Sequence, residues 1–227
     1  MKIITKVSNV HTTAKASRKI EYIVVHYTAG VTSKDGSAAS LADYYRTTST
    51  EVSSDFTVDD TSAVQYNPDI RNRYCWHCGG SKYNTKGGSF YGKCTNANSI
   101  GVEICSTNST GKMQAANDKS YSFTEAAVAN AAELVRKLMS DYNIPAERVI
   151  RHYDVTGKPC PGIVGWNADS GSEAEWNRFK KMIGGTASVS TGAKYYVQVG
   201  AFSEKANADA FLESVKKDYP NAFIKVL

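Results

Sequence analysis

The sequence predicts an α/β domain with one mixed central β-sheet flanked by helices, followed by a small β-α-β tail. Three observations carry this prediction. Short β-branched and aromatic segments alternate with helical patterns over residues 1–183, which is typical of an α/β domain. Residues 184–193, GGTASVSTGA, are small and lack periodicity, as in a linker. One strand, one helix and a second strand then fit into residues 194–227.

Hydrophobic runs and turn residues define the first elements of the domain. The segment IEYIVVH at 20–26 predicts a buried strand that ends at a histidine, and residues 37–47 predict a short helix. The segment SSDFTVDDTSAVQYNP predicts two short strands joined by an Asp-Asp turn. Residues 71–98 predict a long loop, a feature that is usually functional. Residues 99–105, SIGVEIC, predict another strand.

The remaining elements have recognisable start and stop signals. Ser122-Phe-Thr-Glu125 has capping-box spacing and predicts the start of a helix that Asn143-Ile-Pro145 ends. Residues 147–153, ERVIRHY, predict a strand that again ends near a histidine. A last helix of the domain should place Trp176 and Phe179 in the core. In the tail, YYVQVGAF and AFIKV predict strands on either side of a helix, EKANADAFLESVKKDY.

Composition and charge narrow the class of protein. The chain has 227 residues and a formal net charge of +5, which suits an anionic polymer as partner. It has neither a basic run with interleaved aromatics nor zinc-finger spacing, so we expect no nucleic-acid partner. It lacks an 18-residue apolar run and a secretory signal pattern. We therefore expect no membrane span, synthesis in the cytoplasm, and export only with outside help.

Two histidines and a cysteine form a candidate metal site. His26 and His152 lie at or beside the ends of predicted strands, and Cys160 follows the second histidine in RHYDVTGKPCPG. Gly157 and Pro159 can fold this loop back. Two imidazoles and a thiolate are a plausible set of three zinc ligands with an open fourth position, as in catalytic sites. Taken alone, strand-end histidines are more often packed or hydrogen-bonded residues than ligands.

Three motifs in order give this site a family resemblance. The segments IVVHYTAG, NSIGVEIC and RHYDVTGKPCPG resemble those of the type 2 zinc N-acetylmuramoyl-L-alanine amidases, which include phage lysozyme-like amidases and animal peptidoglycan recognition proteins. The resemblance covers roughly residues 18–183. It implies zinc (Zn²⁺) as cofactor, with His26, His152 and Cys160 as its ligands. It also implies cleavage of the bond between N-acetylmuramic acid and the L-alanine of the stem peptide.

The resemblance also assigns catalytic roles. Glu103 occupies the position of the proton-transfer group, and Lys158 the position of a cation that stabilises the negative oxygen of the tetrahedral intermediate. Without the resemblance they are a strand carboxylate, facing solvent or a cleft, and a solvated loop lysine. Some relatives carry a catalytic tyrosine in the strand after the first helix, where this chain has Ser54. Glu103 is therefore expected to be the main proton-transfer group.

The long loop supplies candidate substrate contacts and three cysteines. His77, in CWHCGG, matches a family histidine at the cleft rim, and Trp76 and Tyr74 are candidates for stacking on sugar or stem peptide. One hypothesis for the remaining cysteines is a structural zinc held by four of them. The other is a disulfide that forms between two of the loop cysteines once the protein is outside the cell. In that case Cys105 is a small, buried hydrophobic residue. The four are Cys75, Cys78, Cys94 and Cys105.

The tail resembles the first half of a sporulation-related repeat (SPOR-like) domain, which binds bare peptidoglycan glycan strands. Only one of the domain's two strand-helix-strand units fits into residues 194–227. Because a lone unit would expose an unpaired sheet edge, we expect pairing with a second copy, as a homodimer, or instability of the tail alone. The alternative is a tail that packs on the first domain.

These features favour one function over three others. The leading hypothesis is a peptidoglycan hydrolase, and the wall-binding tail without a signal peptide favours a phage or prophage endolysin. Such an enzyme waits in the cytoplasm and acts on the wall after release. A non-catalytic peptidoglycan receptor typically lacks the zinc cysteine, whereas Cys160 is present. The tail argues against a cytoplasmic muropeptide-recycling amidase, and the lack of a second CxxC argues against a redox or structural-zinc protein.

Overall fold

The computed structural model describes residues 1–83, 87–184, 200 and 202–217. The chain divides into two units, Met1–Ser188 and Val189–Leu227.

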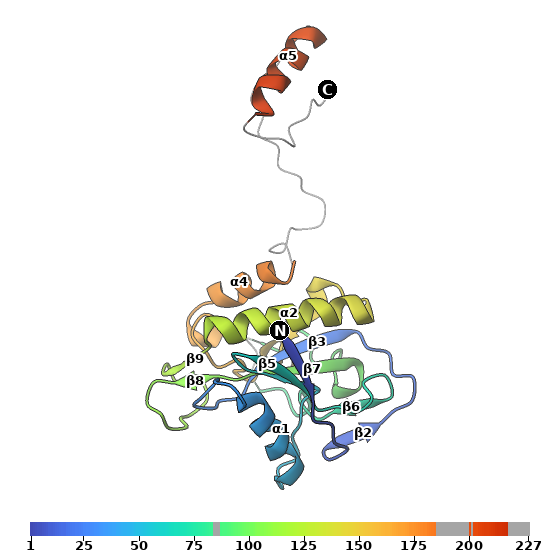
Figure 1. The fold of residues 1–227 in the computed structure, drawn as a ribbon, viewed down its shortest axis with the longest axis vertical. Helices are drawn as coiled ribbons and strands as arrows, with labels where there is room; N and C mark the ends of the chain where they lie inside the picture. Colours follow the sequence, from blue (N-terminus) through green and yellow to red (C-terminus); the bar gives the residue numbers. More distant parts are fainter. Residues whose placement is uncertain (84–86, 185–199, 201, 218–227) are drawn as a thin grey trace. The chain divides into compact units, whose positions relative to one another are not determined.

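A six-stranded mixed sheet forms the centre of the first unit (Figure 1). Its strand order is β1-β5-β4-β7-β3-β10. The bounds are Lys2–Thr5 for β1, Ser62–Gln65 for β5, Phe56–Val58 for β4, Ser99–Ile104 for β7, Tyr22–Tyr27 for β3 and Val149–Arg151 for β10. Neighbouring strands are parallel except β4 and β5, the antiparallel pair that the Asp-Asp turn predicted. The mixed central sheet is thus confirmed.

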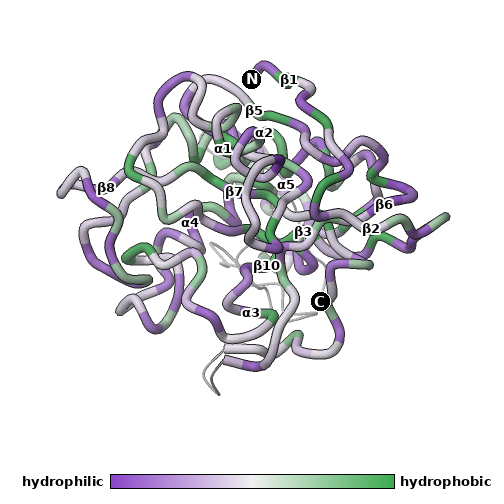
Figure 2. Tube along the Cα trace, turned by 90° about the horizontal axis from the view of Figure 1, so that it is seen from below, coloured by the Kyte–Doolittle hydropathy of each residue, from purple (hydrophilic) through white to green (hydrophobic). Residues whose placement is uncertain are grey.

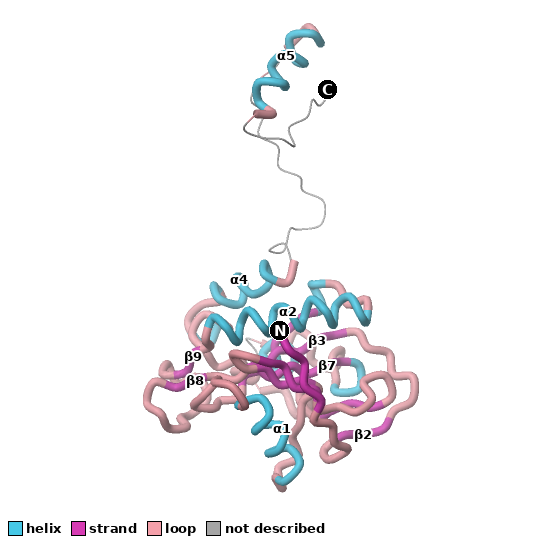
Figure 3. The backbone as a smooth tube through the Cα atoms, in the orientation of Figure 1, coloured by secondary structure: helices cyan, strands magenta, loops and turns pink. Residues whose placement is uncertain are grey.

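Side-chain alternation gives this sheet two different faces. One face, with Val25 and Val102, packs on α2 (Glu125–Tyr142) and α4 (Ala174–Met182). The other face carries His26 and lies against α1 (Ser37–Thr47), α3 (His152–Thr156) and the 71–98 segment. Figure 3 shows the strands between helices on both sides, and Figure 2 shows hydrophobic residues along the central strands. The sequence therefore builds a helix–sheet–helix sandwich with the histidine on one face only.

Two predicted boundaries are wrong, each for a local reason. Helix α2 begins at Glu125 because the Thr124 hydroxyl accepts a hydrogen bond from the Ala127 backbone N–H, so Ser122 is not the cap but belongs to β9. The strand predicted at 147–153 ends at Arg151 and the chain turns into α3 at His152. There the Asp154 carboxylate accepts the Arg151 backbone N–H at 2.8 Å, which starts the helix.

Short strands add structure outside the main sheet. Strand β6 (Arg73–Cys75) lies within the segment predicted as loop and pairs antiparallel with β2 (Thr12–Ala14). Strands β8 (Thr107–Asn108) and β9 (Tyr121–Ser122) form a second small pair. The segment 71–98 is thus tied to the N-terminal residues, and this fixes its position beside the sheet.

The second unit contains the predicted helix as α5 (Lys205–Val215), none of whose residues is buried. The predicted strands YYVQVGAF and AFIKV lie outside the described residues apart from Gly200 and Phe202. Within the described part of the chain, no helix combines the length and apolar character needed to cross a membrane.

Candidate metal centre and active site

Three buried side chains converge at one point on the α1 side of the sheet. The candidate ligand atoms of His26, His152 and Cys160 all lie within 4.8 Å of one another. The His26 and His152 rings meet edge to face with centroids 4.9 Å apart. Nδ1 of His26 lies 3.6 Å from the Cys160 sulfur. Among the described residues this is the one such cluster of three metal-binding side chains.

The fold explains why residues so distant in sequence meet here. Strands β3 and β10 are parallel neighbours in which Val25 pairs with Arg151, so the next residue of each chain segment is a histidine at the same level. Gly157, with φ of 82°, ends α3 in the left-handed conformation that glycine adopts readily. The chain then doubles back, and the Tyr153 N–H donates to the Cys160 carbonyl at 2.9 Å.

The protonation of these groups suits a divalent cation. Burial, followed by the charge of His152, holds the pKa of His26 well below its usual value, and burial lowers that of His152 to about 3. Both imidazoles are therefore neutral and present lone pairs. Burial raises the pKa of the Cys160 thiol to about 12, so its thiolate needs a nearby positive charge. Two neutral imidazoles and such a thiol match the donor set of a catalytic zinc site.

Glu103 lies directly beside the cluster. It pairs with His26 in the β3–β7 register and projects from the same face of the sheet. Its Oε2 is buried and has no hydrogen-bond partner among the described residues. Burial raises the pKa of its carboxyl to about 8, although the Lys158 charge acts against this. A carboxyl of this kind can exchange a proton near neutral pH.

Lys158 is the exposed cation of the site. Its charge lowers the pKa values of His26, His152 and Glu103. It therefore acts electrostatically on the whole cluster while its side chain stays accessible to a bound molecule.

The loop residues predicted to contact substrate occupy three different environments. The His77 side chain is fully buried, and its Nδ1 lies 3.1 Å from Nε2 of His26. The Trp76 indole N–H donates to the Thr13 hydroxyl of β2 at 2.8 Å. Tyr74 lines a hollow of about 420 Å³ beside α3. The hollow is also lined by Cys78, Cys94, Tyr91, Val155 and Thr156.

Sequence reasoning missed the residues that surround His77. Asp55 is buried and lies 4.0 Å from Nε2 of His77, while the Ser99 hydroxyl lies 3.3 Å from the same nitrogen. Gly101 lets the His77 ring approach, since a Cβ there would come within 2.6 Å of it. The one available signal was Ser99-x-Gly101-x-Glu103, whose period of two places all three on one face of a strand.

Ser54 stands where some relatives carry a tyrosine, and a tyrosine of the neighbouring helix α1 lies beside it. Ser54 is buried, and its Oγ lies 3.3 Å from the hydroxyl of Tyr45 in α1. The pKa of Tyr45 is well above its usual value because of burial and, secondarily, the charge of Glu103. A tyrosine hydroxyl thus approaches the site from the helix rather than from the strand.

The four remaining cysteines do not form one metal site. Cys75 and Cys105 pack with α1 in one core cluster, and Cys78 and Cys94 belong to another. The hypothesis of a structural zinc held by all four is therefore wrong. The thiols of Cys78 and Cys94 are hydrogen-bonded to each other. Both are buried, as is Cys105, in agreement with the prediction that Cys105 is a small buried hydrophobe.

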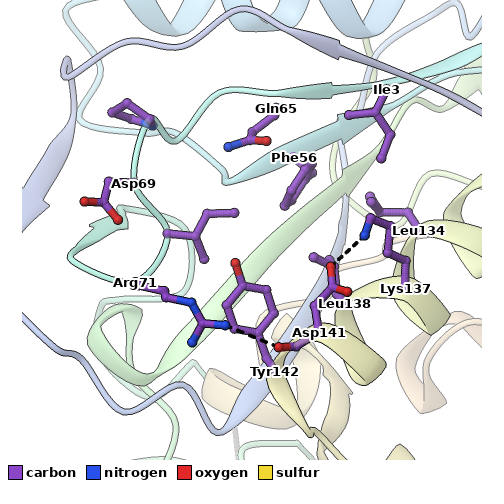
Figure 4. Close-up of a pocket in the computed structure, with 12 residues that line it drawn as sticks. Ile3, Phe56, Gln65, Asp69, Arg71, Leu134, Lys137, Leu138, Asp141 and Tyr142 are labelled. Carbon is purple, nitrogen blue, oxygen red and sulfur yellow. Dashed lines mark hydrogen bonds and ion pairs between the residues drawn. The ribbon is translucent and has the colours of Figure 1, made fainter.

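A second hollow, of about 400 Å³, lies on the opposite face of the sheet (Figure 4). Phe56, Leu134 and Leu138 line its apolar part. Its polar groups are engaged with each other: the Lys137 ammonium pairs with the Asp141 carboxylate at 2.8 Å. It contains none of the three candidate ligands.

Comparison with solved structures places the fold among the catalytic domains of cell-wall amidases. The structure of the catalytic domain of XlyA superposes with a TM-score of 0.57 and 30% identity, over 81% of this chain and 99% of that one. The structure of PlyL superposes with a TM-score of 0.56 and 31% identity, over 83% of this chain and 100% of that one.

The chain belongs to the N-acetylmuramoyl-L-alanine amidase family, whose Amidase_2 model matches residues 16–163. Residues 191–227 match the model of the SPOR domain. The amidase CwlH of Bacillus subtilis is 37% identical over 62% of this chain and 46% of its own length. The amidase XlyA of the same organism is 35% identical over 74% of this chain and 45% of its own length. The chain thus spans about half the length of these curated relatives.

Proposed function

We propose that this protein is a zinc-dependent peptidoglycan hydrolase that cleaves the amide bond between N-acetylmuramic acid and the L-alanine of the stem peptide. The observation that carries the proposal is the convergence of His26, His152 and Cys160 next to Glu103 in a family fold. A non-catalytic receptor on the same fold would have no need of an unpaired buried carboxyl beside a complete set of ligands.

Zinc would be held by the two imidazoles and the Cys160 thiolate. Bound there, it would act as a Lewis acid toward the scissile carbonyl and lower the pKa of water. The neutral state of both histidines and the protonated thiol support this assignment, because a divalent cation would displace the thiol proton.

Glu103 performs the proton transfers of the hydrolysis. Its carboxylate takes a proton from the attacking water as the new C–O bond forms, and its carboxyl then gives that proton to the leaving nitrogen as the C–N bond breaks. The products are a free carboxylate on the muramic acid lactyl group and a free amino terminus on L-alanine. The raised pKa of Glu103, about 8, supports both halves of this cycle.

Lys158 stabilises the negative oxygen that develops on the scissile carbonyl. Its exposed ammonium lowers the pKa values of His152 and Glu103, which supports an electrostatic role beside the cluster. Among the loop residues, Tyr74 is the best candidate for substrate contact because it lines the hollow beside α3.

The SPOR match in the tail supports a role on intact cell wall rather than on soluble fragments. We infer that the protein is an endolysin that acts after release from the cell in which it is made. A solved structure described as a mutant endolysin from Bacillus subtilis is 31% identical with a TM-score of 0.55, which supports this role.

Digestion of purified peptidoglycan tests the proposal. The zinc-loaded protein should release new amino-terminal alanine and no new reducing sugar, and the Cys160→Ala variant should lose most of its zinc and its activity together. New reducing ends would instead identify a glycosidase. Tight binding to the wall without any new alanine amino terminus would identify a receptor.

A further inference from the structure

A buried chain of hydrogen bonds runs from a backbone carbonyl to the ring of His26. The Ser99 hydroxyl donates to the Thr95 carbonyl at 2.6 Å. With its proton used there, Ser99 Oγ accepts from Nε2–H of His77, 3.3 Å away. In a neutral His77 ring, Nδ1 is then the unprotonated nitrogen and accepts from Nε2–H of His26 at 3.1 Å.

The direction of this chain has a consequence at its far end. A backbone carbonyl can only accept, so each proton along the chain points away from His26 and toward Thr95. With a neutral His77, this direction assigns the His26 proton to Nε2 and leaves Nδ1 with a free lone pair. That Nδ1 is the atom 3.6 Å from the Cys160 sulfur.

The surroundings hold the His77 ring in this orientation. Its side chain is fully buried, and it stands edge to face against His26 at an interplanar angle of 89°. The buried Asp55 carboxylate lies 4.0 Å from His77 Nε2 and also accepts the Gly101 N–H at 2.7 Å. It therefore favours a proton on Nε2, the same nitrogen that donates to Ser99. The Cys78 thiol also faces the chain, 3.6 Å from Ser99 Oγ.

We propose that His77 is a positioning residue that fixes the tautomer and ring orientation of His26 so that Nδ1 is always presented to the metal. This inference rests on the zinc site of the proposed function and gives His77 a role behind the ligand rather than on the substrate. Outer partners of metal-bound histidines commonly act in this way, and their loss lowers metal affinity about 10- to 100-fold.

Zinc affinity, measured by competition with a chelating dye, tests the proposal without any substrate. His77→Leu removes the acceptor and should weaken zinc binding about 10- to 100-fold. His77→Asn can place an amide oxygen near the position of Nδ1 and should restore most of the affinity. The matched control is His11→Leu, because Nδ1 of His11 also bonds to a backbone carbonyl, that of Tyr45 at 3.1 Å, and His11 is part of neither the cluster nor the chain of hydrogen bonds. It should leave zinc affinity unchanged.

A spectroscopic measurement covers the case in which His77→Leu does not fold. Long-range ¹H–¹⁵N spectra of the metal-free wild-type protein should show His26 and His77 both protonated on Nε2. In Ser99→Ala, which keeps His77 in place, the two tautomers should become mixed and zinc affinity should fall several-fold.

The inference is overturned if His77→Leu retains wild-type zinc affinity, or if wild-type His26 is protonated on Nδ1. These results differ from a failure of the proposed activity, in which the wild-type protein binds zinc tightly yet releases no amino-terminal alanine from peptidoglycan.

Discussion

Glu103 can be tested without changing the size or position of any side chain. Glu103→Gln keeps the shape of the residue and removes the titrating oxygen, so it should fold, bind zinc and lose at least about a hundredfold in turnover. Hydrolysis of a soluble muropeptide, followed through release of amino-terminal alanine, measures this. Glu133→Gln is the control, since Glu133 pairs with the N-terminus on the opposite face of the sheet. Near-wild-type turnover in Glu103→Gln would move proton transfer to another residue.

Single residues differed in how far the sequence could predict them. His26, His152 and Cys160 could be proposed because their side-chain types are metal ligands and their motifs resemble a family. Asp55, Ser99 and Gly101 could not, since their importance lies in contacts with His77 that only the folded chain creates. His77 itself was expected at the cleft rim in contact with substrate, because sequence does not reveal that the β2–β6 pair anchors its loop beside the sheet.

At the scale of elements, the junction between β10 and α3 depends on one buried arginine. Arg151 donates from Nε and from an η nitrogen to the two oxygens of Asp154, at 2.9 and 2.6 Å, and stacks over Trp176. Arg151→Ala leaves the Asp154 carboxylate without its partner and should lower the free energy of unfolding by about 3–5 kcal/mol, measured by urea denaturation. Because His152 follows directly, zinc affinity should fall as well.

Arg178→Ala is the matched control for this arginine. Arg178 forms ion pairs with Glu125 and Glu175, but in a partly exposed position on α4. Its removal should cost about 1 kcal/mol or less. Equal losses in the two variants would show that the β10–α3 junction has no special role.

The 71–98 segment, which contains Cys78 and Cys94, should form a disulfide on oxidation. The hydrogen bond from Cys94 holds the pKa of Cys78 well below its usual value, which favours the reactive thiolate. With oxidised glutathione as electron acceptor, the two thiols should lose two protons and two electrons and form a disulfide. Peptide mapping by mass spectrometry should find this bond, and Cys78→Ser should abolish it. A bond from Cys75 or Cys105 instead would contradict the arrangement of the two clusters.

Elements with a strong periodic pattern were predicted well. Helix α1 has the bounds expected from its sequence, and α2 is capped by Asn143 in the left-handed conformation, as its stop signal indicated. Elements defined by partners were not predicted: β6 is a strand because β2 pairs with it, and neither carries an alternating pattern of its own. Tertiary pairing decided these short segments.

At the scale of the whole molecule, the two units should have separable functions. Deleting residues 184–227 should leave hydrolysis of soluble muropeptides intact and weaken binding to insoluble peptidoglycan at least about tenfold, measured by sedimentation. Unchanged wall binding would reject a targeting role for the tail.

The same unit should also bring two chains together. No residue of α5 is buried, and the Phe202 and Phe211 rings, 5.3 Å apart, are both partly exposed. A tail of fewer than about 40 residues without cysteine or histidine usually needs association to be stable. Light scattering should therefore detect dimers of the full-length protein and monomers after the deletion. A full-length protein that stays monomeric at high concentration would reject the pairing.

The wide spacing of the three candidate ligands means that a metal ion bound by them would be a cross-link as well as a cofactor. His26 and Cys160 lie 134 positions apart along the chain, so a bound ion ties the middle of the sheet to a loop near the end of the unit. An ion that binds the native state alone, at a concentration far above its dissociation constant, adds about 4 kcal/mol to the free energy of unfolding. Chelation should then lower the melting temperature by about 10 °C in calorimetry. The Cys160→Ala variant should melt at one temperature with or without chelator, and an identical shift in that variant would place the stabilising ion elsewhere.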